Sequence, residues 1–388
     1  MEINRPKSVE IKGTVYTGLW SSEEIPVYTI LSADGLNQFV GYVKHINATN
    51  GTVLYRGQCS LYPSVIPSIC RDTEKLAENK AKLDNVLEVM VQDDGVKKYW
   101  HLGENRDISD WKEYQKLILE ATLQHYGAST FCVDFVDNHW TALWFGLYRW
   151  NKEKGKYEKR DSAEKQENED RYVVQDPTSR IFAQPPTEPQ CVGIDALSPE
   201  DVSHAKTQAM RSKKSEEYYL QREITKKNNG LKSKWREALQ KYEDDPLRKL
   251  YFEDEKQGHL YLFLYVADTN APTVRGISLG SETYVLDLRK TIPSTFLRPC
   301  AQHGWIVKGI QEEQYCYEKN IACVLRISVG IVSQMLGNGI LTSEDNFFPS
   351  YHNDNGYDIL LRRQEGTRRA ARKKYPKILP ENTIPVFE

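Results

Sequence analysis

The sequence predicts an α+β fold, and two observations carry that prediction. Helical patterns dominate the first 150 residues, and short β-prone runs dominate from residue 259 onward. Helices and strands that occupy separate stretches of a chain are typical of α+β proteins, whereas regular alternation indicates a parallel α/β sheet.

Each element of the first half has its own local signal. Alternating apolar residues predict a strand over residues 9–20, and the run TVLYR predicts a second strand over 52–56, stopped by Gly57. Apolar residues at helical spacing predict helices over 36–46, 74–90, 111–126 and 138–150, with Gly127 as the C-terminal cap of the third helix.

The middle of the chain changes composition sharply. Charged side chains dominate residues 151–171, which cannot bury much apolar surface. Prolines at 185, 186 and 189 indicate a linker, and Ser198 followed by Pro199 indicates a helix start that leads into a polar helix over 203–242. We therefore interpret residues 151–246 as a charged, largely helical insertion.

Strand character returns after the insertion. The runs at 259–266, 284–288, 305–308 and 323–327 predict strands, and residues 329–337 predict a helix closed by glycine. The predicted organisation is an N-terminal extension (1–38), a catalytic domain in two pieces (39–150 and 247–361), the insertion (151–246) and a basic tail (362–388).

Composition bounds the class of protein. Hydrophobic residues make up 39% and charged residues 27%, with a formal net charge of −2, which is ordinary for a globular protein. The sequence shows no signal peptide and no apolar run long enough for a membrane span, so we expect a cytoplasmic protein without a membrane partner. The seven cysteines form no CxxC pair and the histidines no HExxH motif, so no metal is expected.

The segment Tyr55-Arg56-Gly57-Gln58 is the first candidate for chemistry. An arginine at a strand end, followed by glycine, can face a cleft while the backbone passes close to a ligand. The guanidinium fork suits a phosphate or pyrophosphate. A surface or structural arginine is the alternative interpretation.

The second candidate surrounds a predicted helix end. His125 can donate to a ligand and Tyr126 can stack on a planar ring, or the pair can simply cap the helix. Thr130 and Asp134 follow. Asp134 lies in the apolar run FCVDFV, where a carboxylate must be paired or hydrogen-bonded, so it is either a catalytic group or the partner of Arg56.

Two later segments complete the set. Gln302, in RPCAQHGW, either orients a ribose or a nucleophile or is an ordinary turn amide. The aromatic residues of FFPS, at 347–350, are expected in the core.

Together and in this order, these segments resemble the FRG domain. The family's arginine-glycine-glutamine element and its proline-bearing stretch match Tyr55-Arg56-Gly57-Gln58 and YPS…PSICR. Its "LQHYGxPTRLLDWTxNPxxALxFA" element matches LQHYGASTFCVDFVDNHWTALWFG, and its "RxxAQxGxF" and "FPDxxG" elements match RPCAQHGW and FFPSYHNDNG. Phe131 replaces the arginine of the family pattern, whereas Thr130 and Asp134 are retained.

The FRG domain in turn looks similar to the ADP-ribosyltransferase superfamily, which has a split, mixed or antiparallel β core with flanking helices. The resemblance implies that Arg56 anchors NAD, within a binding segment that also includes Tyr55, Gly57 and Gln58. It implies further NAD contacts from the residues His125, Tyr126 and Thr130. It also implies that Gln302 occupies the family's late Glu or Gln position, which aligns the reacting ribose. The reaction displaces nicotinamide from the ribose through a transition state of oxocarbenium character, so a nearby carboxylate is expected, and Asp134 is the candidate.

The expected acceptor is nucleic acid, RNA or DNA, ahead of protein. The tail carries seven basic residues, namely Arg362, Arg363, Arg368, Arg369, Arg372, Lys373 and Lys374, which can contact phosphates or form a solvated helix face. The resemblance implies a toxin or anti-phage effector neutralised by an antitoxin protein. The alternatives are a non-catalytic nucleic-acid-binding or protein-interaction module, modification of a protein target, and, ranked lower, a hydrolase.

Overall fold

A computed structural model describes most of the chain. The described residues are 2–7, 9–100, 111–151, 153–154, 156–161, 172–176, 179, 181–182, 184–212, 214–271, 273–337, 343–350 and 352–365. By contacts, these fall into two compact units. Unit 1 comprises residues 1–176 and 254–388, and unit 2 comprises residues 177–253.

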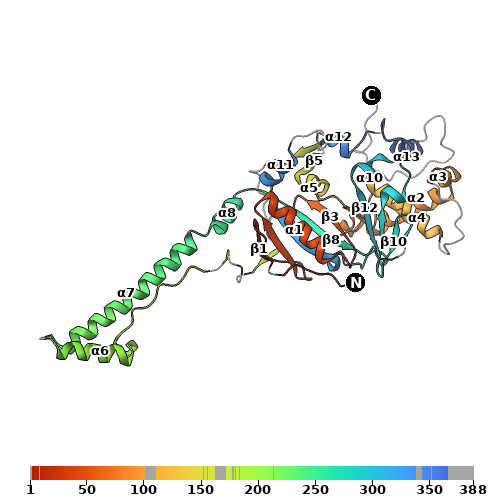
Figure 1. Ribbon diagram of the computed structural model, residues 1–388. Helices are drawn as coiled ribbons and strands as arrows, with labels where there is room; N and C mark the ends of the chain where they lie inside the picture. The colour runs from red at the N-terminus through yellow and green to blue at the C-terminus, as the bar shows by residue number, and fades with distance from the viewer. Residues whose placement is uncertain are drawn as a thin grey trace. The chain divides into compact units, whose positions relative to one another are not determined.

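A mixed β-sheet forms the centre of unit 1 (Figure 1). Its strands are β1 (Thr14–Trp20), β2 (Ile25–Ile30), β3 (Thr52–Gln58), β4 (Cys132–Val136), β7 (Val173–Gln175), β8 (His259–Ala267), β9 (Thr273–Val274), β10 (Ile277–Leu279), β11 (Thr283–Asp287), β12 (Gly304–Gly309) and β13 (Ile321–Ser328). The spatial order is β7-β1-β2-β13-β8-β3-β4-β12-β11-β10-β9. Strands β2 and β13 pair in parallel, and the other neighbours pair antiparallel. A separate hairpin joins β5 (Tyr148–Asn151) to β6 (Lys156–Lys159).

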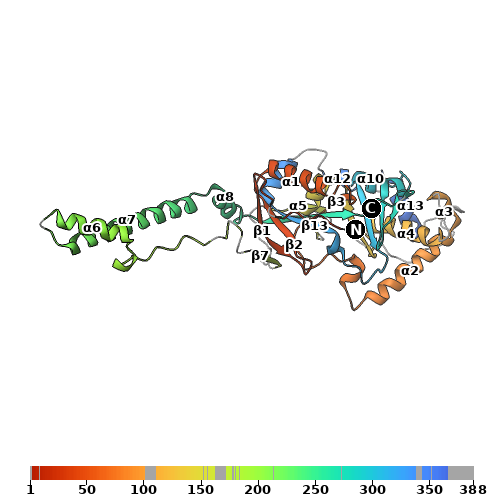
Figure 2. The ribbon, with the colours of Figure 1, turned by 60° about the horizontal axis from the view of Figure 1, so that its bottom comes forward.

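Helices pack against the sheet in two groups. The helices of unit 1 are α1 (Ala33–Ile46), α2 (Leu76–Gln92), α3 (Asp94–Tyr99), α4 (Trp111–His125), α5 (His139–Leu147), α9 (Leu288–Thr291), α10 (Leu297–Ala301), α11 (Val329–Leu336), α12 (Glu344–Phe347) and α13 (Asn355–Glu365). Short 3-10 helices span Ser68–Arg71 and Tyr317–Asn320 in unit 1 and Ile194–Ala196 in unit 2. Figures 1 and 2 both place α1 and α5 beside β3, and Figure 1 shows α2, α4 and α13 near β10 and β12, with which they share an apolar cluster.

The two groups cover one face of the sheet. One apolar cluster joins α1, α5 and α11 to β2, β3, β8 and β13, and another joins α2, α3 and α4 to β4 and β10–β12. Cys132 belongs to the second cluster and Val136 to the first, and residues four apart on a strand share a face. Strand β4 is therefore the boundary at which the two helical groups meet.

The predicted α+β fold class is confirmed, and most predicted elements are present within a few residues of their expected bounds. Gly127, with φ of +90°, ends α4 as expected. Seven described strands were not expected, namely β2, β4, β5, β6, β7, β9 and β10. The predicted helix over 138–150 instead ends at Leu147, where the chain turns into β5, and the polar helix over 203–242 is divided in two.

Unit 2 contains α6 (Pro199–Met210), α7 (Glu216–Glu243) and most of α8 (Pro246–Asp254). Helix α6 begins with a capping box in which Ser198 and Asp201 each bond the other's backbone amide. Trp235 of α7 donates its indole N–H to the Pro186 carbonyl at 2.8 Å. These contacts tie the preceding proline-rich segment to the helices.

Two further observations on the described residues concern membrane spans and metal sites. Among the described helices, none combines the length and the apolar character that a membrane span needs. The described side chains include no group of three or more His, Cys, Asp or Glu placed to hold a metal ion.

Candidate functional site

The site begins where β3 and β4 separate. A single residue pair, Tyr55 with Val136, joins these strands, whereas β3 pairs along its whole length with β8 on its other side. At the opening, Arg56 Nη1 donates a hydrogen bond to the backbone carbonyl of Asp134 at 2.8 Å. The arginine side chain thus satisfies a carbonyl that lacks a strand partner on that side.

Gly57 is required because α5 lies directly on β3. A Cβ built on Gly57 would be 1.7 Å from the Ala142 carbonyl oxygen and 2.9 Å from the Gly146 nitrogen. Helix α5 starts close to β4, since the Asn138 side chain caps it by accepting from the Trp140 amide at 3.0 Å. The glycine after Arg56 therefore serves helix packing.

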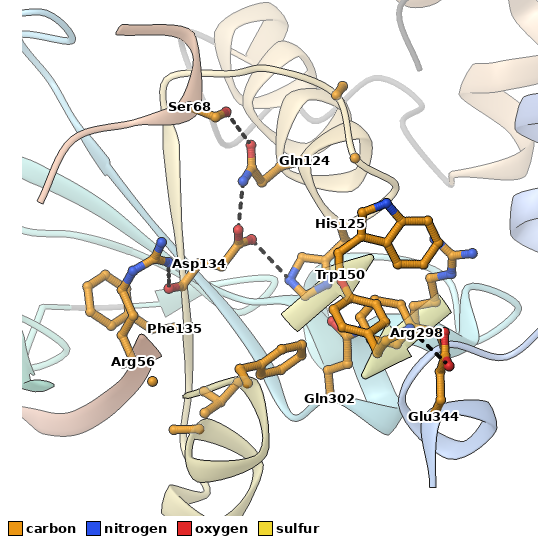
Figure 3. A pocket seen from close by; sticks show the side chains of 18 of the residues that line it. Arg56, Ser68, Gln124, His125, Asp134, Phe135, Trp150, Arg298, Gln302 and Glu344 are labelled. Carbon is orange, nitrogen blue, oxygen red and sulfur yellow. Dashed lines mark hydrogen bonds and ion pairs between the residues drawn. The ribbon is translucent and has the colours of Figure 1, made fainter. Parts of the chain in front are cut away.

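A pocket of about 1020 Å³ opens at this point, entirely within unit 1 (Figure 3). Its lining comprises Tyr55, Arg56, Gly57, Ser68, Arg71, Gln124, His125, Gly127, Ala128, Ser129, Asp134, Phe135, Val136, Ala142, Phe145, Trp150, Tyr157, Arg298, Gln302, Glu344, Phe348, Ser350 and Tyr357. Its volume lies at the upper end of the range of roughly 300–1,000 Å³ that is usual for small-molecule sites.

A chain of hydrogen bonds fixes the Asp134 carboxylate. Gln124 Nε2 donates to Asp134 Oδ2 at 2.6 Å, and Gln124 Oε1 accepts from the Thr130 hydroxyl at 2.6 Å and from the Ser68 hydroxyl at 3.5 Å. Asp134 Oδ1 has no hydrogen-bond partner among the described groups. One carboxylate oxygen is thus held by Gln124, whereas the other is buried and makes no hydrogen bond to a described group.

His125 lies beside this carboxylate and is almost fully buried. Its Nε2 is 3.6 Å from Asp134 Oδ1, and its side chain is 3% exposed. Burial lowers the pKa of His125 below its usual value, although the Asp134 carboxylate opposes this effect. The imidazole is therefore neutral at neutral pH.

Gln302 is held at the end of α10. Its side chain is buried, and its Nε2 donates to the Phe347 carbonyl of α12 at 2.7 Å. Its backbone N–H donates to the Arg298 carbonyl at 2.9 Å. Because both bonds are internal, the position of the amide is set by the fold.

Three arginines line the pocket, Arg56, Arg71 and Arg298. None has a carboxylate within 4 Å in the part of the chain that the structure describes. Burial lowers the pKa of Arg56, Asp134 opposes this shift and Arg71 adds to it, but an arginine remains charged at neutral pH. The pocket therefore contains arginines that form no described ion pair, although the Asp134 and Glu344 carboxylates also belong to its lining.

The ion pair between Arg56 and the Asp134 carboxylate, one of the two alternatives for Asp134, does not form. Arg56 bonds the main-chain carbonyl instead, and the carboxylate turns towards Gln124 and His125. The interpretation of Asp134 as the ion-pair partner of Arg56 is thus wrong, and its carboxylate lies between Gln124 and His125 in the lining of the pocket.

Most predicted site residues converge on the pocket. Arg56, Asp134 and Gln302 line it, as do Tyr55, Gly57 and His125. Three others lie outside the lining.

The three predicted site residues outside the pocket lining are Tyr126, Thr130 and Gln58. Tyr126 is buried and donates its hydroxyl to Asp354 Oδ2 at 2.5 Å, and burial raises its pKa well above the usual value. Thr130 is buried and supports Gln124. Gln58 ends β3, and its Oε1 is buried without a hydrogen-bond partner among the described groups.

Several lining residues were not singled out from the sequence. Ser68, Gln124 and Arg298 fall inside the motifs themselves, so the signal was present there. Trp150 and Tyr157 come from the β5–β6 hairpin, within or next to a charged run that carries no motif. Only the folded hairpin brings them to the pocket.

The predicted nucleic-acid-binding tail is largely outside the described residues. The backbone of Arg362 and Arg363 belongs to α13, without described side chains. Arg368, Arg369, Arg372, Lys373 and Lys374 lie outside the described residues.

Comparison with known proteins gives one match. No curated protein and no solved structure matches the chain significantly. Residues 51–155 are similar to the FRG domain, whose family model matches them, and this agrees with the first two motifs of the sequence. The matched segment includes β3, Gln124, Asp134, helix α5 and strand β5, but neither Arg298 nor Gln302.

Proposed function

We propose that the protein is an ADP-ribosyltransferase that uses NAD and acts on a macromolecular acceptor. One observation carries the proposal. Arg56, whose buried Nε has no hydrogen-bond partner among the described groups, shares a pocket with a carboxylate that is held by one oxygen and free at the other.

The pocket residues suit a dinucleotide. The guanidinium groups of Arg56 and Arg71 both line the pocket and can bind a pyrophosphate, because their planar fork matches the geometry of phosphate oxygens. A volume of about 1020 Å³ is ample for NAD. NAD is thus compatible with the charge and the size of the site.

Each side chain has a role in transfer. Bound NAD supplies the glycosidic bond that breaks, so that nicotinamide leaves as a neutral amide, an acceptor atom bonds to the ribose carbon and the acceptor's proton is released. The Asp134 carboxylate, oriented by Gln124, places negative charge where positive charge develops. Neutral His125 and the fixed amide of Gln302 offer hydrogen bonds.

The test is release of nicotinamide from NAD by the purified protein in the presence of a cell lysate. We expect Arg56→Ala to lower the rate by about 10²–10³, the effect of losing one charged anchor at a reacting group. Arg149→Ala is the matched control, because Arg149 is exposed on β5 and outside the lining, and its rate should equal that of the wild type.

Absence of nicotinamide release from the wild type, together with absence of NAD binding, would sink the proposal. The competing binding module predicts nucleic-acid binding that weakens with salt, survives Arg56→Ala and disappears on truncation before Arg362.

Nucleic acid is the acceptor that we propose, because the tail from 362 to 374 is strongly basic. Radiolabel from NAD should appear on RNA or DNA, and label on protein alone would exclude this acceptor. A toxin or anti-phage role, with a neutralising protein in the cytoplasm, predicts growth inhibition on expression that Arg56→Ala relieves.

A further inference from the structure

Arg298 is a buried cation that the proposed reaction has not used. It lies in α10, is 9% exposed and lines the pocket (Figure 3). Its guanidinium carbon is 4.2 Å from the ring centroid of Tyr357 and 5.0 Å from that of Tyr126. Its Nε has no hydrogen-bond partner, and no carboxylate lies within 4 Å of it, among the described residues.

The two nearest carboxylates are bonded to other groups and make no described ion pair with the Arg298 guanidinium. Asp354 is engaged by the Tyr126 hydroxyl at 2.5 Å and by the backbone amides of Tyr357 and Arg298 at 3.0 and 3.3 Å. Glu344 accepts from the Tyr157 amide at 3.2 Å, and burial raises the pKa of its carboxyl. The aromatic ring faces offset only part of the cost of burying a cation, and no described carboxylate pairs directly with the guanidinium, so Arg298 can accept an anionic ligand.

Planar apolar surface adjoins this cation. The Phe348 ring centroid is 5.8 Å from the Arg298 guanidinium and stacks on Tyr157 with centroids 4.6 Å apart and an angle of 18°. Trp150 meets Tyr157 edge to face at 5.1 Å, and all three aromatic residues line the pocket. A cation beside aromatic rings is the arrangement that binds a base together with its phosphate.

This cation is separate from Arg56. Figure 3 shows Asp134 and His125 between Arg56 on one side and Arg298 on the other. The carboxylate proposed to act in transfer thus lies between two cationic ends of one pocket.

We propose that Arg298, with Trp150, Tyr157 and Phe348, forms a second subsite that takes a phosphorylated nucleotide unit of the acceptor, while Arg56 takes NAD. The role as acceptor subsite rests on the proposed transferase function. Recognition of a base with its phosphate does not depend on it, and so the two are tested separately.

The test uses the full-length protein without NAD and two trithymidylates, one with a 5′-phosphate and one with a 5′-hydroxyl. We expect calorimetry to show the phosphorylated trimer binding about tenfold or more tightly, the effect of one charge-assisted contact. Arg298→Met should make the two affinities equal. Arg56→Met is the matched control and should keep the preference within threefold, whereas its NAD affinity should fall.

Thymidine 5′-monophosphate and thymidine distinguish a free nucleotide from a nucleic-acid end. Comparable phosphate preference with the monomers assigns the subsite to free nucleotides, and preference confined to the trimers assigns it to a nucleic-acid end. Either result supports phosphate recognition by Arg298, and only the second supports a nucleic-acid acceptor.

Two results overturn the proposal. One is an unchanged phosphate preference in folded Arg298→Met. The other is a loss of NAD affinity in Arg298→Met as large as that in Arg56→Met, which would make Arg298 part of the NAD site.

If Arg298→Met does not fold, Trp150→Ala replaces it, since Trp150 is only half-buried. It should weaken both trimers about tenfold by loss of stacking, and an unchanged affinity overturns the proposal. A further outcome is that the wild type and the variants all fail to bind NAD while Arg298 still determines the preference for the phosphorylated trimer. In that case the proposed transferase function fails and the nucleotide subsite stands.

Discussion

His125 keeps its position in the pocket because residue 304 has no side chain. A Cβ built on Gly304 would lie 2.5 Å from His125 Cε1 and 2.8 Å from Nε2. The glycine of RPCAQHGW and the histidine of LQHYG are therefore two halves of one packing arrangement. Each motif is weak evidence by itself, because the residue that explains it lies in the other motif.

Gly304→Ala should destabilise the fold by about 1–3 kcal/mol, since the new methyl group forces a buried ring to move. The free energy of unfolding from urea titration measures this. Gly41→Ala is the control, because no atom lies within 4 Å of the new Cβ on α1, and it should gain about 0.5–1 kcal/mol. Equal effects at the two positions would contradict the packing argument.

Thr130 acts on the pocket through Gln124. Thr130→Val removes both a donor to Gln124 Oε1 and an acceptor for the Cys132 amide at 3.1 Å, so we expect a loss of about 1–3 kcal/mol of unfolding free energy. Thr130→Ser, which keeps the hydroxyl, should lose much less. A valine variant as stable as the serine variant would show that the chain to Asp134 contributes little.

The histidine His139 gives a pH dependence whose sign is fixed. Burial, with a contribution from Lys44, lowers its pKa to about 4, compared with about 6.5 in an unfolded chain. Between these values the unfolded state binds more protons, so stability is present above pH 6.5 and is lost as the pH falls towards 4.

His139→Phe keeps a ring against Tyr55 and Trp140 but cannot titrate. Its urea midpoint should therefore fall less between pH 7.5 and pH 5 than that of the wild type. Some pH dependence should remain, because burial also lowers the pKa of His125. An identical fall in both proteins would contradict the assignment to His139.

At the scale of elements, β2 and β4 escaped prediction for physical reasons. All six residues of β2 are buried, so the strand lacks the alternation that marks a half-exposed strand. In β4, Asp134 interrupts an apolar run and resembles a loop residue until its partners in α4 are known. Helix α5 was predicted in the right place but too long, because the aromatic residues of β5 fit the spacing of a helix as well as that of a strand.

Helix α5 depends on Gly57 for its contact with β3. Gly57→Ala should cost at least about 3 kcal/mol or prevent folding, since the clash is with the backbone of Ala142, which cannot rotate away. Thermal melts of soluble protein measure this. Gly146→Ala is the control, because its new Cβ meets the flexible Leu260 side chain at 3.2 Å, and its loss should be smaller.

A loss as large for Gly146→Ala would show that α5 tolerates no addition on this face. That result would contradict a specific role for Gly57, which would then be one of several close-packed positions.

At the scale of the molecule, the order of the motifs predicted which residues meet, but not which of them face the cavity. Arg56, Asp134 and Gln302 are far apart in sequence, yet all three line one pocket: Arg56 and Asp134 lie on the adjacent strands β3 and β4, and Gln302 follows α10 just before β12. Tyr126, next to His125, points into the core instead, because the chain turns at Gly127 and its hydroxyl reaches Asp354. The orientation of the Tyr126 side chain depends on a contact with a residue 228 positions away, which the local hydrophobic pattern cannot predict.

Every residue that lines the pocket belongs to unit 1, which makes unit 2 dispensable for the site. Unit 2 also holds its own two connecting segments together. Arg248 donates to the Ile181 carbonyl, and Tyr251 meets Phe182 edge to face at 5.8 Å. These contacts lie outside residues 186–243, so a short Gly/Ser linker can join residue 185 to residue 244.

We expect the variant with 186–243 replaced by such a linker to keep the thermal midpoint of unit 1 and its NAD affinity within threefold of the full chain. The physical reason is that the excised part contains neither a strand of the sheet nor a lining residue. Calorimetric melting and NAD titration measure the two properties. If the variant folds but loses NAD binding, residues 186–243 complete the site, and the assignment of the whole pocket to unit 1 is wrong.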